Sequence, residues 1–241
     1  MSLRGRVHNV MPWSLTHPPP RWHVETPAEL ARRRQVTAAT SLAGAGLLAV
    51  GLSAEPDSPR FYAATSGVAA TWLVGGLAAG PLHLGWTTQR GGALRRPITT
   101  PVLTGVAAFG AFYAAAHVAR RVPVLEDAIR SVLTYAHSGS TSKVLLTALA
   151  NGAAEEVFFR GAGYAALGER HPVALSTAGY ALATAATRNP ALVLAAGVMG
   201  ALFGTQRRAT GGIQAPILTH LTWSSLMLRF LPPLFPPKAS L

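Results

Sequence analysis

Cysteine is absent from this chain of 241 residues, and charged side chains make up only 12% of it. Without cysteine there can be neither a disulfide framework nor a metal site with thiolate ligands. Acidic residues are scarce too, because nine Asp and Glu stand against 21 Lys and Arg. The net charge of +12 invites a nucleic-acid interpretation, but the arginines fall in the gaps between apolar runs. Charge placed in that way indicates membrane topology, so we expect no nucleic-acid partner.

Hydrophobic residues account for 49% of the chain and gather in long runs. This composition predicts an all-α, polytopic helical membrane protein with about seven transmembrane helices. The predicted spans are residues 36–53, 61–83, 98–119, 142–167, 173–187, 190–206 and 212–231. Residues 1–35 form a polar N-terminal arm, residues 36–231 the membrane domain, and residues 232–241 a Pro-rich tail. Residues 120–139 alternate charged and apolar side chains, which predicts an interfacial amphipathic helix.

The loop arginines predict a cytoplasmic N terminus, because most of them lie on the same side of the membrane as the N-terminal arm. That side holds Arg32, Arg33, Arg34, Arg90, Arg95, Arg96, Arg170, Arg207 and Arg208. The basic segment before the first span also fits a secretory signal cleaved after Ala54. We favour an uncleaved first span because further spans follow, and we expect an integral protein of a bacterial plasma membrane.

Two adjacent carboxylates and an arginine lie inside the fourth apolar run, at Glu155, Glu156 and Arg160. Ionisable groups at that depth cost several kcal/mol each to bury without partners, so they indicate a functional site. On a helix Glu156 and Arg160 share a face and can pair. Glu155 lies about 100° round the helix and would be left free, which suits a general base. The alternative is an ion pair that only packs helices.

Distant polar residues are predicted to arrive at similar depth. Helix rise puts Glu155 about 10 Å, His220 about 12 Å and Thr184 about 16 Å above the inner boundary of a core about 30 Å thick. Residues that converge in this way can share one buried site.

Two motifs resemble a known family. Residues 155–161, Glu-Glu-Val-Phe-Phe-Arg-Gly, are similar to the Glu-Glu-x-x-x-Arg signature of the CAAX-protease and bacteriocin-processing (CPBP, or ABI) intramembrane proteases. Residues 210–220 resemble the family's last motif, a Gly-rich turn and Ala-Pro followed by a histidine on a helix. The resemblance covers a core of about residues 142–231.

The chain departs from the family pattern at two positions. The pattern has a histidine four residues after an aromatic residue on the fifth span, where this chain has Tyr180 and then Thr184. It also has an asparagine or similar residue four after the last histidine, where this chain has Ser224. His83, His117 and His171 are candidates to replace the missing histidine, although packed or interfacial roles are the simpler interpretation of all three.

The resemblance implies a membrane-embedded hydrolase, a metalloprotease in one interpretation, that cuts a membrane-associated peptide or protein segment. Glu155 would be the general base and Glu156 its partner, held by Arg160. His220 would stabilise the oxyanion or bind a metal, with Ser224 assisting and Thr184 in the vacated histidine place. The metal set would shrink to Glu155, Glu156 and His220, holding zinc or another divalent ion, because threonine is a poor zinc ligand. A cavity that faces the cytoplasm is expected.

Two alternatives remain. The lost histidine favours a pseudoprotease of the same fold that binds a partner without cutting it. Paired carboxylates within a membrane also serve proton relays, which favours a small transporter. Against a transporter, the chain shows no paired internal repeat.

Overall fold

The computed structural model describes residues 17–19, 23–168 and 170–237. Most of the predicted N-terminal arm and the last four residues of the predicted tail therefore lie outside the described residues. The helices are α3 (Pro27–Gly51), α4 (Pro59–Ala78), α5 (Thr99–Ala119), α6 (Pro123–Ser138), α7 (Thr141–Glu155), α8 (Tyr164–Ala166), α9 (Pro172–Ala185), α10 (Pro190–Thr210) and α11 (Gln214–Phe230). A π-helical segment, η1 (Glu156–Gly163), joins α7 to α8, and a short 3-10 turn, η2 (Pro232–Leu234), follows α11.

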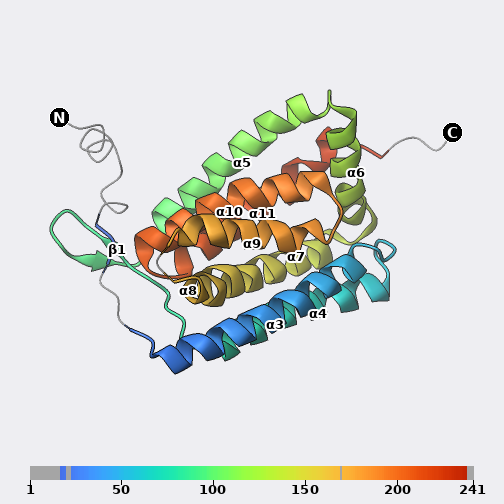
Figure 1. Ribbon diagram of the computed structural model, residues 1–241. Coiled ribbons are helices and arrows are strands. Elements are labelled where there is room, and N and C mark those ends of the chain that lie inside the picture. The colour runs from blue at the N-terminus through green and yellow to red at the C-terminus, as the bar shows by residue number, and fades with distance from the viewer. Residues whose placement is uncertain (1–16, 20–22, 169, 238–241) are drawn as a thin grey trace.

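The long helices lie roughly side by side in an elongated bundle, so the bundle has two distinct ends (Figure 1). We call the near end the one where α3 and α9 begin and α10 stops, beside the small hairpin of β1 (Thr87–Thr88) and β2 (Leu94–Arg95). The far end is the opposite one, where α3 and α9 stop, α10 begins and α6 lies. The predicted helical regions are confirmed as helices, including the amphipathic segment now seen as α6.

Helix starts follow local capping chemistry. The Thr26 side chain accepts the Glu29 backbone N–H, the Glu29 carboxylate accepts the Thr26 N–H, and Pro27 occupies the first turn. This capping box begins α3 well before the apolar run that predicted the first span. At the far end the Asn189 side chain caps α10 by accepting the Leu192 N–H, and Pro190 occupies the first helical position. The connection between α9 and α10 is therefore a tight turn.

Close packing of α3 on α4 depends on glycine. A side chain at Gly44 would collide with the Trp72 ring, and one at Gly75 would collide with Thr40. Trp72 is 1% exposed and also stacks on Phe158 of η1, with ring centroids 4.7 Å apart. The α3–α4 pair is thereby fixed against the segment that carries the two glutamates.

A backbone clamp ties the loop after α4 to the turn before α11 at the near end. Trp86 N donates to Thr210 O at 2.8 Å, and Ile213 N donates to His83 O at 2.9 Å. These two segments approach so closely that a side chain at Gly85 or Gly212 would overlap the backbone of the other segment. Gly85 also has φ +89°, a conformation that favours glycine.

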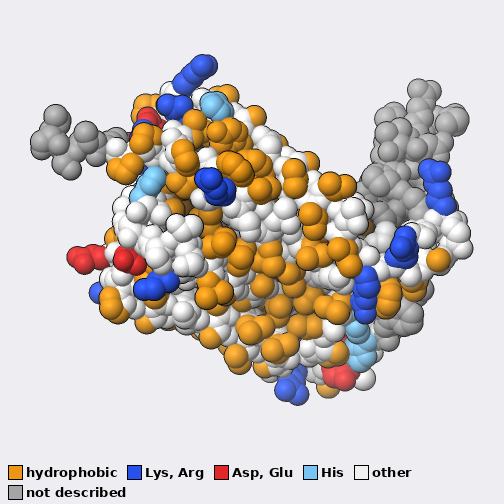
Figure 2. Space-filling model, turned by 180° about the vertical axis from the view of Figure 1, so that it is seen from behind, with side chains coloured by type: hydrophobic (Ala, Val, Ile, Leu, Met, Phe, Trp, Pro, Cys, Tyr) orange, Lys and Arg blue, Asp and Glu red, His pale blue; other side chains and the backbone are white. Residues whose placement is uncertain are grey.

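The exterior of the bundle is largely apolar. In the part of the chain that the structure describes, two helices, α4 and α5, are long and apolar enough to cross a membrane. Exposed large hydrophobic side chains include Leu73, Val74, Leu103, Val106, Leu182, Leu194 and Val198. Figure 2 shows hydrophobic side chains over much of the middle of one face, with Lys and Arg mostly around its periphery. Such a surface fits a lipid environment, while the number of helices that span the bilayer stays a prediction.

Candidate active site

The segment with the two glutamates changes helix type between them. α7 ends at Glu155, and η1 begins at Glu156 as a π-helical stretch through Gly163. Short π-helical turns are rare and occur often at functional sites. The sequence predicted one continuous α-helix here, because no local pattern distinguishes the two helix types. Val157, Phe158 and Phe159 are all buried, so the irregular turn is held by packing on every side.

The predicted pair of Glu156 and Arg160 is confirmed and fully buried. Arg160 Nε lies 3.4 Å from Glu156 Oε2, and both side chains are 0% exposed. Arg160 also donates from Nη2 to the Gly200 carbonyl at 3.1 Å. A side chain at Gly200 would press on this guanidinium at 3.2 Å. Gly200 thus leaves space on α10 for the Arg160 guanidinium.

His220 completes the buried group from α11. Its Nδ1 lies 3.0 Å from Glu156 Oε1, so a single carboxylate is shared by the arginine and the histidine. Phe203 stacks on the imidazole with centroids 4.8 Å apart and ring planes 21° apart. The carboxylate that contacts Nδ1 fixes the orientation of the ring, so that Nε2 is left to bind another group. Sequence reasoning did not foresee this contact between Glu156 and His220.

Glu155 is not free, which corrects the expectation drawn from helix geometry. The Tyr180 hydroxyl on α9 donates to Glu155 Oε2 at 2.6 Å. The Tyr180 ring lies against Phe159, with centroids 4.9 Å apart, and over the Arg160 guanidinium at 4.6 Å. Tyr180 entered the sequence argument only as the aromatic residue of a motif, and its hydrogen-bonding role had no local signal.

One cavity of about 190 Å³ joins the predicted residues. It is lined by Leu48, Leu52, Glu155, Tyr180, Thr184, Thr187, Leu192, Ala195, Ala196, Met199, Phe203, His220 and Trp223. The predicted convergence of Glu155, Thr184 and His220 is therefore seen in space. Glu156 and Arg160 lie behind this wall. Ser224 is not among the lining residues, and Trp223 stands there instead.

Thr184 occupies the cavity wall where the family pattern has a histidine. Its hydroxyl donates to the Tyr180 carbonyl one turn earlier at 2.9 Å. That bond satisfies the donor, and the oxygen keeps acceptor capacity. None of His83, His117 and His171 is among the residues that line this cavity. Within the described part of the chain, the missing imidazole thus has no substitute at this place.

The predicted metal ligands Glu155, Glu156 and His220 do not form an ion site. Among the described residues, no group of three or more His, Asp and Glu side chains is arranged to hold an ion. The reason lies in the contacts above, because Glu156 is engaged by Arg160 and by His220 Nδ1. Glu155 is turned to Tyr180. The residues present do not fit a three-ligand zinc site, so we derive no step through a metal.

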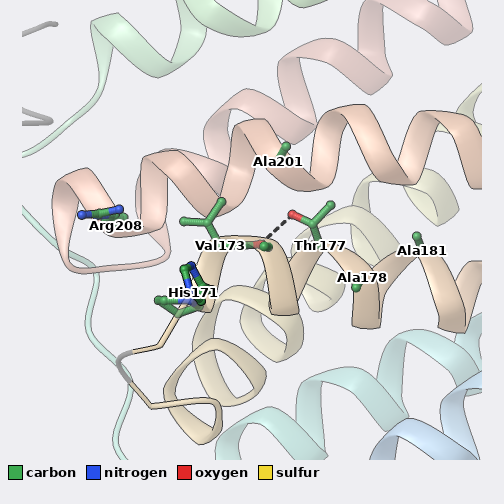
Figure 3. Close-up of a pocket in the computed structure, with 9 residues that line it drawn as sticks. His171, Val173, Thr177, Ala178, Ala181, Ala201 and Arg208 are labelled. Atoms are coloured by element: carbon green, nitrogen blue, oxygen red, sulfur yellow. Dashed lines mark hydrogen bonds between the residues drawn. The ribbon is translucent and has the colours of Figure 1, made fainter. Parts of the chain in front are cut away.

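A second hollow lies between α9 and α10, away from the glutamates. Its volume is about 520 Å³, and His171, Pro172, Val173, Ala174, Thr177, Ala178, Ala181, Ala201 and Arg208 line it. Figure 3 shows His171 and Arg208 near one end and the small side chains along the helices. Thr177 donates to the Val173 carbonyl there, so its hydroxyl stays on its own helix. Neither glutamate lines this hollow.

Comparison with known proteins adds one finding. Residues 137–226 match the family profile described as type II CAAX prenyl endopeptidase Rce1-like. The matched stretch contains both motifs, Tyr180 and Thr184. No curated protein and no solved structure matches the chain significantly.

Proposed function

Because the chain carries a domain of the CPBP/CAAX protease family, we propose that it is an intramembrane endopeptidase acting through a glutamate-activated water. Its substrate is a membrane-associated peptide or protein segment. One observation carries the proposal: Glu155 and His220, brought from α7 and α11, face the same small cavity. The location that follows is a bacterial plasma membrane.

The proposed reaction uses water as the nucleophile. Glu155 takes a proton from a water molecule in the cavity, and the hydroxide attacks the scissile carbonyl carbon. The carbonyl oxygen becomes an oxyanion, and the Nε2–H of protonated His220 donates to it. Glu155 then gives the proton to the leaving amine, so that the C–N bond breaks and the carboxylate is restored. A cavity of about 190 Å³ has room for water beside Glu155.

Glu156 is a positioning residue in this scheme. Its carboxylate accepts Nδ1–H from His220 and stabilises the imidazolium, while Arg160 fixes the carboxylate from the other side. Tyr180 does the same for Glu155 by donating its hydroxyl proton to one oxygen. The other carboxylate oxygen remains for the water. Ser224 stands outside the cavity wall, so this scheme gives it no contact with substrate.

The test is proteolysis by the purified protein in lipid nanodiscs on a mixed membrane-peptide library. We expect cleavage by the wild type and a fall of roughly 100-fold or more in Glu155→Gln, since glutamine keeps an acceptor for Tyr180 but cannot take a proton. Parallel assays with added zinc and with a chelator decide whether a metal takes part. Cleavage that persists at the wild-type rate in a stably folded Glu155→Gln protein would overturn the assignment of the base.

A second candidate function is a pseudoprotease that binds its partner without cutting it. The observation in its favour is Thr184, whose hydroxyl cannot replace an imidazole as a cationic donor. In the same assay the pseudoprotease interpretation predicts no cleavage by the wild type and cleavage by Thr184→His. Thr177→His is the matched control, because Thr177 lies on the same helix but faces the other hollow. Activity gained equally in both variants would contradict this interpretation.

A further inference from the structure

The site cavity extends from the glutamates toward the far end of the bundle. Leu48 and Leu52 lie at the end of α3, and Thr187 follows the last turn of α9. Leu192 lies in the first turn of α10. Figure 1 shows that α3 and α9 stop and α10 begins at the far end. The lining thus leads outward from Glu155 on that side.

The length of this path follows from helix geometry. Tyr180, which touches Glu155, and Thr187 are seven residues apart, which corresponds to roughly 10 Å along the axis. Apart from the two threonines, the side chains along this path are apolar. Leu48, Leu52, Thr187 and Leu192 are each partly exposed, so the path reaches the surface.

At the near end the hollow between α9 and α10 is larger, but neither glutamate lines it. Arg207 Nε donates to the Arg160 carbonyl at 2.8 Å, which ties α10 to η1 just below the buried ion pair. A side chain at Gly204 would press on Val173 at 3.1 Å, and one at Gly161 would press on Leu82 at 2.8 Å. The backbone clamp at Gly85 and Gly212 closes the next layer. These contacts pack the near end closely around the buried ion pair.

α6 frames the far-end opening from two sides. The Tyr135 hydroxyl donates to the carbonyl of Leu52 at 2.8 Å, and Leu52 itself lines the cavity. Asn189 Nδ2 donates to the Ala128 carbonyl at 2.8 Å and to Ser131 Oγ at 3.0 Å. Asn189 lies between the lining residues Thr187 and Leu192 along the chain. The amphipathic helix therefore holds in place both loops that border the opening.

We propose that the scissile segment reaches Glu155 from the far end, through an opening bordered by α3, the α9–α10 turn and α6. The segment that fits is an extended stretch with apolar side chains, because aliphatic residues form most of the wall. This inference rests on the proposed function for its substrate, but the route itself does not depend on catalysis. Which side of the membrane the far end faces stays a prediction, and so does the expected cytoplasm-facing cavity.

The route can be tested because the chain contains no cysteine. Single cysteines are introduced at Ala195 in the cavity wall, at exposed Gly91 in the near-end hairpin, and at exposed Glu55 in the far-end loop. Each variant, also carrying Glu155→Gln, is placed in oriented vesicles and treated from one side with a membrane-impermeant maleimide. We expect Ala195→Cys to react from the same side as Glu55→Cys, and Gly91→Cys to react from the opposite side.

Reaction of Ala195→Cys from the side of Gly91→Cys would overturn the proposal, and so would no reaction from either side. A functional readout comes from blocking the path with Ala195→Trp, which should raise KM strongly in the cleavage assay. Ala201→Trp is the matched control on α10, since Ala201 lines the other hollow. A wild type without cleavage together with far-side labelling would refute the protease and keep the route.

Discussion

The two neighbouring glutamates belong to regions of opposite character. Around Glu156 everything is closed: its carboxylate and Arg160 are 0% exposed, and His220 is 6% exposed. Around Glu155 the wall opens into a cavity, and the hydrogen-bond partner that reaches it there is the Tyr180 hydroxyl. One residue step along the chain, at a change of helix type, therefore separates a carboxylate held in a buried ion pair from one that borders a cavity.

Removing Arg160 from the buried group around Glu156 should have the largest effect on stability and cleavage. Arg160→Met leaves the Glu156 carboxylate buried with His220 as its remaining ionic partner, and removing one member of a buried pair costs about 3–5 kcal/mol. We expect both the unfolding free energy and cleavage to fall, measured by denaturant unfolding in micelles and by the nanodisc assay. Arg60→Met, at an exposed arginine of the far end, is the control and should change neither. Equal stability of the two variants would contradict a structural role for the ion pair.

Replacing Glu155, which borders the cavity, should lower activity and leave stability unchanged. For Glu155→Gln we expect cleavage to fall roughly 100-fold to 10,000-fold, the contribution typical of a general base. The unfolding free energy should stay near that of the wild type, because the amide oxygen of the introduced glutamine can still accept the Tyr180 hydroxyl proton. Single-turnover kinetics and denaturant unfolding on the same preparation check both halves. A large loss of stability would assign Glu155 to the closed region instead.

Part of this contrast was predictable from sequence. Apolar runs gave the helices, and the four-residue spacing gave the Glu156–Arg160 pair. Helix rise alone placed Glu155, Thr184 and His220 at one depth, and all three line one cavity. These features depend on local geometry, which regular helices transmit over long distances.

Other parts needed the folded chain. His220 could have met either glutamate; in the fold its Nδ1 lies 3.0 Å from Glu156 Oε1, and Phe203 of α10 stacks on the imidazole. The π-helical turn and the Tyr180 hydrogen bond depend in the same way on contacts between helices distant in sequence. The direction of the cavity is shown by the residues that line it, and no periodicity in the sequence indicates that set.

Tyr180→Phe removes the hydrogen bond to Glu155 but leaves an aromatic ring in the same place. The phenyl ring keeps its packing on Phe159 and Arg160 but loses the hydrogen bond to the carboxylate. A hydrogen bond to a charged group contributes about 1.5–3 kcal/mol, so we expect cleavage to fall by roughly 10-fold to 100-fold. The variant also changes the proton affinity of Glu155, so the pH profile of kcat should move while that of the Arg60→Met control does not. An unchanged profile and rate would show that the carboxylate is oriented by something else.

The smallest change adds one methyl group beside His220. In Gly152→Ala the new Cβ would lie 3.2 Å from Cδ2 and Nε2 of the imidazole, so the ring must move by a few tenths of an ångström. Gly197→Ala is the control, because no other atom lies within 4 Å of a side chain there. Alanine in a helix interior is worth about 0.5–1 kcal/mol over glycine, so the control should gain stability at unchanged activity. Gly152→Ala should lose that gain and lower kcat several-fold with KM unchanged, because in the proposed reaction the imidazole contacts the developing oxyanion and not the ground-state substrate. A lowered KM or an undisturbed kcat would instead place the oxyanion away from His220.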